Sequence, residues 1–244
     1  MTALIRSELL RLRTTRATWG LLAAALVLTL GWEAVVLSGI GGIDAPARGS
    51  AELRDALLGS TGLGLFAVLM LGVVAATSEF HHATVTSTFL ATPRRGRVLG
   101  AKAAACALVA PPVAVLLLVV AWTTGVLAGA ISMTVETETL SVVARSMVVA
   151  ACWALLGIGV GVAIRNQTVA VIVPLVWFLV IETLIPAYGL SWLLPWLPGG
   201  AMTALAGGRY PGAQAAWVAF LVVMAYVLAL LVPGAQAIRR RDIT

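Results

Sequence analysis

Charged residues are scarce in this sequence, because only 11% of its 244 amino acids are Asp, Glu, Lys or Arg. A soluble domain carries about a quarter charged residues, so this composition excludes an ordinary soluble protein. Cysteine is also rare. Cys106 and Cys152 both lie within apolar runs, where they form no metal-ligand spacing and do not report a redox compartment.

The signatures of metal and nucleotide chemistry are absent as well. The chain has no HExxH motif, and its His81-His82 pair does not replace one, because adjacent side chains on a helix point about 100° apart and cannot share an ion. No GxxxxGK[ST] phosphate-binding loop occurs either. We therefore expect no metal site, no ATP binding and no enzymatic activity in this chain by itself.

What the sequence has in excess is apolar length. Hydrophobic residues make up 61% of it, and its mean hydropathy is +1.03. A helix needs about 20 residues to cross the hydrocarbon core, and a backbone in lipid must satisfy its own hydrogen bonds. The alternation of a membrane β-barrel is missing. We therefore predict an all-α polytopic membrane protein, with residues 1–244 in a single transmembrane domain. Its six spans are predicted at about 18–40, 61–79, 103–128, 142–164, 168–188 and 215–237.

Residues 1–18 predict a helix of a different kind. Leu4, Ile5, Leu9 and Leu12 recur at helical spacing, with arginines at other positions. This pattern is typical of an amphipathic helix at the inner membrane surface, with its arginines near anionic headgroups. The alternative is a merely basic flank of the first span. The apolar stretch that follows is longer than the hydrophobic region of a signal peptide, so we expect the segment to be retained.

Lys and Arg are distributed unevenly between the predicted loops, and this predicts the orientation. Of the 16 basic residues, twelve flank one side of the six spans and three the other, so the basic side and both termini are expected to be cytoplasmic, in the cell membrane. Because these residues flank apolar runs, the net charge of +6 indicates the lipid bilayer as partner, and no nucleic acid. The twelve are Arg6, Arg11, Arg13, Arg16, Arg94, Arg95, Arg97, Lys102, Arg165, Arg239, Arg240 and Arg241.

Two further stretches predict how the spans are arranged. Residues 189–214 are too apolar for an ordinary loop and, with Pro195 and Pro198, too broken for a span. They predict an outer re-entrant or interfacial hairpin that is shielded by protein. Gly157 and Gly161 form a small-xxx-small pair in the fourth span, which predicts close helix packing.

Three charged residues lie inside the predicted spans, toward their outer ends: Glu33, Arg145 and Glu182. A charge at a helix centre costs about 2.5–3.5 kcal/mol on insertion scales, so such residues usually face a cavity or one another. Two interpretations stay open. The three line a polar outer chamber, or Arg145 forms an ion pair with Glu33 or Glu182 that only fixes the packing.

The remaining signal is a set of short motifs in fixed topological places. They are SELLRLRTTR at 7–16, EFHHAT at 79–84, TFLATPRRGRVL at 88–99 and LPGGA at 197–201. Together with six spans and a broken outer hairpin, they resemble the permease subunits of ABC-2 type (type V exporter-like) ATP-binding cassette (ABC) transporters, over nearly the whole chain. His81 and Ala83 stand where the family has Arg and Gly, while Glu79 and Thr84 match.

This resemblance implies a permease subunit of an ATP-driven ABC transporter, an exporter of a hydrophobic or amphipathic compound. Two permease subunits, identical or different, would pair, and each would dock a separate ABC ATPase that binds ATP and Mg. Residues 80–97 would be the cytoplasmic coupling segment, with Phe89 and Leu90 as an apolar anchor inside a polar rim. The coupling residues implied are Glu79, His81, Thr84, Thr88, Phe89, Leu90, Arg94 and Arg95.

Two other functions are compatible with such a bundle. An ion-coupled secondary transporter usually has buried acids near the membrane midplane and repeated halves, whereas Glu33 and Glu182 lie off-centre and no repeat is visible. A non-transporting membrane component, such as a sensor or an immunity protein, also stays open, because topology alone does not define activity.

Overall fold

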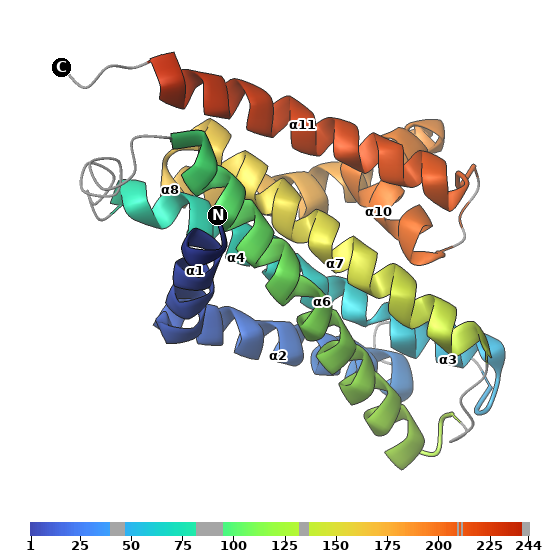
Figure 1. Cartoon of the computed structure of the whole chain (residues 1–244). Coiled ribbons are helices and arrows are strands. Elements are labelled where there is room, and N and C mark those ends of the chain that lie inside the picture. The colour runs from blue at the N-terminus through green and yellow to red at the C-terminus, as the bar shows by residue number, and fades with distance from the viewer. Residues whose placement is uncertain (40–46, 82–94, 132–136, 209, 211, 241–244) are drawn as a thin grey trace.

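The computed structural model describes residues 1–39, 47–81, 95–131, 137–208, 210 and 212–240 as a bundle of helices (Figure 1). Within these residues there is no strand, and six helical stretches are long and apolar enough to cross a membrane. The predicted all-α polytopic fold is thereby confirmed. The helices are α1 Thr2–Thr14, α2 Arg16–Ser38, α3 Ala51–Gly59, α4 Thr61–His81, α6 Arg95–Leu127, α7 Thr137–Ile164, α8 Gln167–Val176, α9 Glu182–Leu184, α10 Pro198–Ala206 and α11 Ala216–Arg240.

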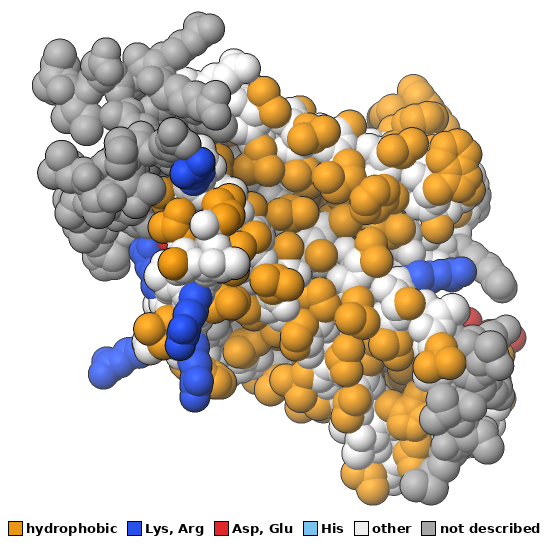
Figure 2. All heavy atoms as spheres, in the orientation of Figure 1, with side chains coloured by type: hydrophobic (Ala, Val, Ile, Leu, Met, Phe, Trp, Pro, Cys, Tyr) orange, Lys and Arg blue, Asp and Glu red, His pale blue; other side chains and the backbone are white. Residues whose placement is uncertain are grey.

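The six stretches run between two ends of the molecule. One end carries α1, the last turn of α4, the first turn of α6 and the last turn of α11, and we call it the α1 end (Figure 1). The opposite end carries α3, and we call it the α3 end. Figure 2 shows a broad apolar band between them, with most of the visible Lys and Arg side chains at the α1 end. This is the surface expected of a protein that spans a bilayer.

Helix α7 lies at the centre and packs against α4, α6 and α11. Two glycines allow α7 to approach α4 closely. A Cβ at Gly157 would collide with the backbone oxygen of Leu69, and a Cβ at Gly161 would lie 2.7 Å from the Cβ of Ala76. The close packing predicted for this small-xxx-small pair is confirmed, and its partner is α4.

The helix predicted over residues 1–18 is divided in two. Thr15 has extended backbone angles, so the chain turns there, and α2 begins at Arg16. The apolar side of α1 faces protein: Leu12 is 8% exposed within the main core, and Leu9 packs against that core. Burial of these leucines against other helices explains why α1 lies across the α1 end of the bundle.

Helix α6 begins earlier than the predicted third span. It starts at Arg95, inside the segment 80–97 that the sequence assigned to a loop, and the predicted span began only at 103. Val98 and Lys102 lie one helical turn apart, and both are buried, at 5% and 4% exposure. The basic stretch therefore has a buried face, and this face extends the helix by about two turns.

The fifth predicted span is present but interrupted. Helix α8 gives way to a π-helical turn, η1 (Trp177–Ile181), then to α9 and to a 3₁₀ turn, η2 (Pro186–Tyr188). Pro174, inside α8, removes one backbone donor three residues before η1. The predicted hairpin after it contains two helical pieces, η3 (Ser191–Trp196) and α10, which pack against each other and against α11. Most of α10 is buried, as expected of a hairpin shielded by protein.

Candidate functional site

At the α1 end, an acid and a lysine from distant parts of the chain form a buried ion pair. Nζ of Lys102, on α6, lies 3.0 Å from Oε2 of Glu8, on α1, and the two side chains are 6% and 13% exposed. At such burial each charge needs its partner, because removing one leaves the other unpaired and out of water. The pair therefore holds α1 against the start of α6.

Two more polar contacts connect α1 to its neighbours. Nη2 of Arg11 donates to Oγ of Ser78, on α4, at 2.7 Å. Nε1 of Trp19, on α2, donates to the backbone oxygen of Arg13 at 2.9 Å. Helix α1 is thus joined by side-chain contacts to α2, α4 and α6, so the N-terminal segment is a fixed part of the bundle at this end.

Three of the predicted coupling residues lie on α4 and α6, two of the helices that contact α1. Glu79 and His81 belong to the last turn of α4, and Arg95 is the first residue of α6. The other predicted coupling residues lie outside the residues that the structure describes. These are Thr84, Thr88, Phe89, Leu90 and Arg94.

At the α3 end, Glu33 lies at the junction of α2, α4 and α6. It is 2% exposed. Its two carboxylate oxygens lie within hydrogen-bonding distance of Ser60 Oγ, just before α4, and of Thr124 Oγ1, on α6. Glu33 therefore faces a polar cluster formed by hydroxyl groups.

Glu182 fastens the hairpin to the interrupted fifth span. Its Oε1 accepts hydrogen bonds from Nε1 of Trp177 at 2.7 Å and from the backbone N–H of Gly199 at 3.1 Å. Gly199 lies in the first turn of α10, where free N–H groups favour a carboxylate. A Cβ at this glycine would collide with Oε2 of Glu182, so a larger residue here would force the carboxylate to shift.

Two tyrosines complete the attachment of the hairpin. The hydroxyl of Tyr226, on α11, donates to the backbone oxygen of Trp196 at 3.1 Å, and that of Tyr210 donates to Gly200 at 2.9 Å. The pKa of Tyr210 is raised, mainly by burial and to a smaller extent by the charge of Glu182. Its phenol therefore stays protonated, and remains a donor, over the physiological pH range.

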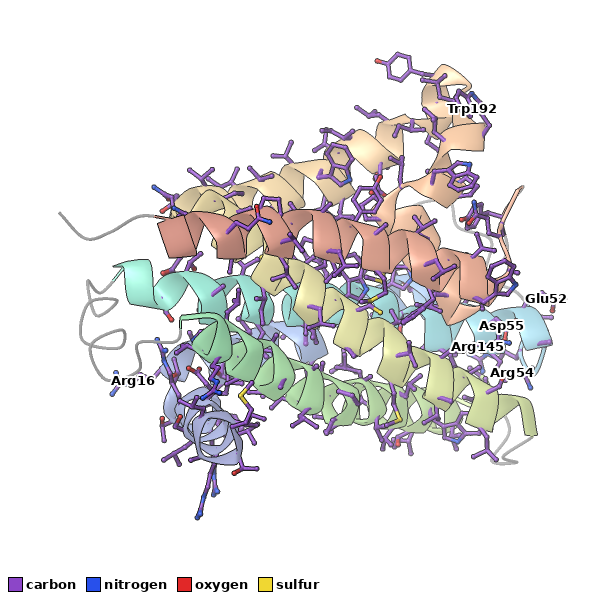
Figure 3. All side chains as sticks on the ribbon, turned by 45° about the horizontal axis from the view of Figure 1, so that its top comes forward. Arg16, Glu52, Arg54, Asp55, Arg145 and Trp192 are labelled. Carbon is purple, nitrogen blue, oxygen red and sulfur yellow. The ribbon has the colours of Figure 1, made fainter. Side chains whose placement is uncertain are left out.

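Of the two interpretations left open for the intramembrane charges, the ion pair of Arg145 with Glu33 or Glu182 is not formed. Arg145 is exposed, near the α3-end terminus of α7, and its guanidinium lies beside Gly207. Figure 3 shows it at the same end as Glu52, Arg54 and Asp55 of α3. A pair was one interpretation because all three charges lie near outer span ends, but each acid contacts other groups.

The chain matches no protein-family model and no curated protein. The functional assignment therefore depends on the motifs and on the geometry given above. Taken together, the α1 end has a docked, charge-paired helix that contacts α4 and α6, the two helices on either side of the predicted coupling segment. The α3 end has two separate buried carboxylates, one in a hydroxyl cluster and one at the hairpin.

The Glu8–Lys102 pair was not predicted from the sequence. The signal was present, because Lys102 is the only lysine in the chain and Glu8 the only acid before Glu33. Glu8 also lies one turn before Leu12 and one turn after Leu4, which places it on the apolar side of the helix. An acid on the apolar side of one helix and a single lysine at the edge of an apolar run can therefore be inferred to pair with each other.

Proposed function

We propose that this chain is the transmembrane permease subunit of an ATP-driven ABC transporter, an exporter of a hydrophobic or amphipathic compound. It would act with a second permease subunit and with a separate ABC ATPase, which would bind the ATP and Mg. The α1 end would face the cytoplasm of a cell-membrane protein with both termini inside. The motifs that resemble ABC-2 permeases support this proposal.

The observation that carries the proposal is the docking of α1 against α4 and α6, the two helices that the coupling segment connects. A force on the segment between α4 and α6 can move both helices as one body only if their ends are joined to a rigid element. The buried Glu8–Lys102 pair and the Arg11–Ser78 hydrogen bond join α1 to both of these helices. A push from an ATPase would then move α1, α4 and α6 together, as rigid-body gating requires.

The coupling segment itself would supply the contact with the ATPase. Phe89 and Leu90 would fill an apolar pocket, Thr84 and Thr88 would form hydrogen bonds at its rim, and the arginines would pair with acids. An aromatic anchor that excludes water carries much of the binding energy of a small interface. The chain itself would carry out no hydrolysis.

A substitution in this anchor tests the proposal. We expect Phe89→Asp to abolish both ATPase binding and ATP-dependent transport, because it places a charge in the apolar pocket. The measurement is co-purification of a Walker A protein with the tagged chain, followed by transport in proteoliposomes. Leu127→Asp is the matched control, since Leu127 is 81% exposed at the other end of α6. Unchanged ATPase binding in Phe89→Asp would exclude this coupling role.

The buried Glu33 supports one other function, an ion-coupled secondary transporter. Intramembrane acids commonly bind the ions that drive such proteins. The same proteoliposomes distinguish the two functions. Transport by the purified chain alone, driven by an ion gradient without nucleotide, would favour the secondary transporter. No transport under either condition would favour a sensor or immunity component.

A further inference from the structure

The two hydroxyl groups beside Glu33, those of Ser60 and Thr124, form more oxygen–oxygen contacts than they have hydrogens to donate. Ser60 Oγ lies 3.2 Å from Glu33 Oε1 and 2.5 Å from the backbone oxygen of Leu57. Thr124 Oγ1 lies 2.5 Å from Glu33 Oε2 and 2.9 Å from the backbone oxygen of Val120. A hydroxyl has one hydrogen, and an ionised carboxylate has none. Thr124 Oγ1 also lies 3.1 Å from the backbone oxygen of Ala121. Two hydrogens therefore serve five oxygen–oxygen contacts.

The shorter contact of Ser60 decides where its hydrogen points. At 2.5 Å against 3.2 Å, Leu57 is the closer acceptor, so a lone pair of Ser60 faces the carboxylate. Two oxygens that face each other through lone pairs repel, unless a positive charge lies between them. A cation that binds oxygen lone pairs needs no donor, so it would relieve this repulsion.

The burial of Glu33 also calls for a positive charge next to its carboxylate. The residue is 2% exposed, and no Lys or Arg among the described residues forms an ion pair with it. An unpaired charge at this depth is strongly destabilising. One carboxylate calls for one positive charge, which matches a monovalent cation.

A third hydroxyl lies one turn further along α2. Thr29 is completely buried, and its Oγ1 has no hydrogen-bond partner among the described residues. It lies on the same face of α2 as Glu33 and points to Gly64, one turn after Ser60 on α4, where a Cβ would collide with it. An unpartnered hydroxyl at this depth costs free energy unless a ligand uses it. It extends the oxygen-lined interface between α2 and α4 by one turn.

From these contacts we propose that Glu33, Ser60 and Thr124 bind a sodium ion, with Thr29 as an additional oxygen on the same face. Hard cations take carboxylate, hydroxyl and carbonyl oxygens, and membrane helices coordinate sodium with such groups. The ion would join α2, α4 and α6 at the α3 end, just as the Glu8–Lys102 pair joins α1 to α6 at the other. The site does not depend on the proposed ATP-driven function.

Thermal unfolding of the purified full chain tests the site, without any ATPase. We expect NaCl to raise the unfolding temperature in a saturable manner relative to choline chloride at equal ionic strength, because the ion binds only the folded bundle. In Glu33→Gln this increase should vanish, while Glu52→Gln, an exposed acid of α3, should keep it. Thr124→Val should raise the half-saturating NaCl concentration about tenfold, while its exposed neighbour Thr123→Val should not.

Four outcomes would overturn the assignment. They are an equal unfolding temperature in NaCl and choline chloride for the wild type, an undiminished sodium response in Glu33→Gln, an equal response to KCl, and a response to pH with none to sodium. The last would identify a proton as the occupant. If Glu33→Gln does not fold, the wild type and Thr124→Val still decide, through equilibrium binding of radioactive ²²Na⁺ to the detergent-solubilised chain.

Discussion

Single residues matter most in this chain where a charge is buried, and each buried acid is treated differently. Glu8 faces a lysine, Glu182 accepts an indole and a backbone N–H, and Glu33 faces hydroxyl groups. The first two therefore have an ammonium group or N–H donors, which have no other role as acceptors. The hydroxyls beside Glu33 also contact backbone oxygens, which is why Glu33 calls for an additional ligand.

Removing one member of the Glu8–Lys102 pair should destabilise the protein. We expect Lys102→Met to lower the free energy of unfolding by about 3 kcal/mol, because it leaves Glu8 charged and buried without a partner. The measurement is thermal or denaturant unfolding in detergent, followed by intrinsic tryptophan fluorescence.

The double variant Glu8→Leu with Lys102→Met separates charge pairing from packing. It should recover most of the lost stability, because apolar side chains of similar volume replace a buried pair at little cost. Arg97→Met is the control, since it removes an exposed positive charge from the same helix. Additive losses in the double variant would show that the two residues do not act as a pair.

The intramembrane charges could be found from sequence, but their partners could not. Glu33, Arg145 and Glu182 stand out because charges are rare in apolar runs. Which groups they contact depends on the rotation of each helix and on the course of the hairpin. Neither is encoded locally, so the sequence left the pair with Arg145 open as one of two interpretations, and the structure does not form it.

At the scale of elements, apolar length predicted the spans well and their interruptions poorly. The ends of the predicted first, fourth and sixth spans lie within a few residues of those of the helical stretches. The break at Trp177–Ile181 and the early start of α6 were missed. Hydropathy reports how long a segment is apolar, but not whether its backbone stays α-helical, since that depends on tertiary contacts.

Two glycines provide a matched test of helix packing. We expect Gly157→Ala to lower the free energy of unfolding by about 1–3 kcal/mol, because its new methyl group would push α7 away from the backbone of α4. Gly20→Ala, in α2, should cost nothing and can add up to about 1 kcal/mol through helix propensity, since nothing lies within 4 Å of its Cβ position. Equal effects in the two variants would exclude close α4–α7 packing as the reason for Gly157.

At the scale of the whole molecule, the described ends of the chain lie at one end of the bundle (Figure 1). An even number of spans requires this, and the structure has six candidate spans. Which end faces the cytoplasm is a separate question, because it depends on how the loops cross the membrane during insertion. The excess of Lys and Arg in the loops at the α1 end predicts that this end stays inside.

Cysteine labelling tests this orientation. Arg16 and Trp192 lie at opposite ends of the molecule (Figure 3) and both are exposed. Native Cys106 and Cys152 are buried, so they should not react and need not be replaced. We expect a membrane-impermeant maleimide to label Trp192→Cys on intact cells and Arg16→Cys only after permeabilisation. The reverse pattern would invert the orientation and place Phe89 outside, where no ATPase could bind it. Labelling of both from the same side would mean that an even number of crossings separates the two sites, so that one of the five candidate spans between them does not cross the membrane.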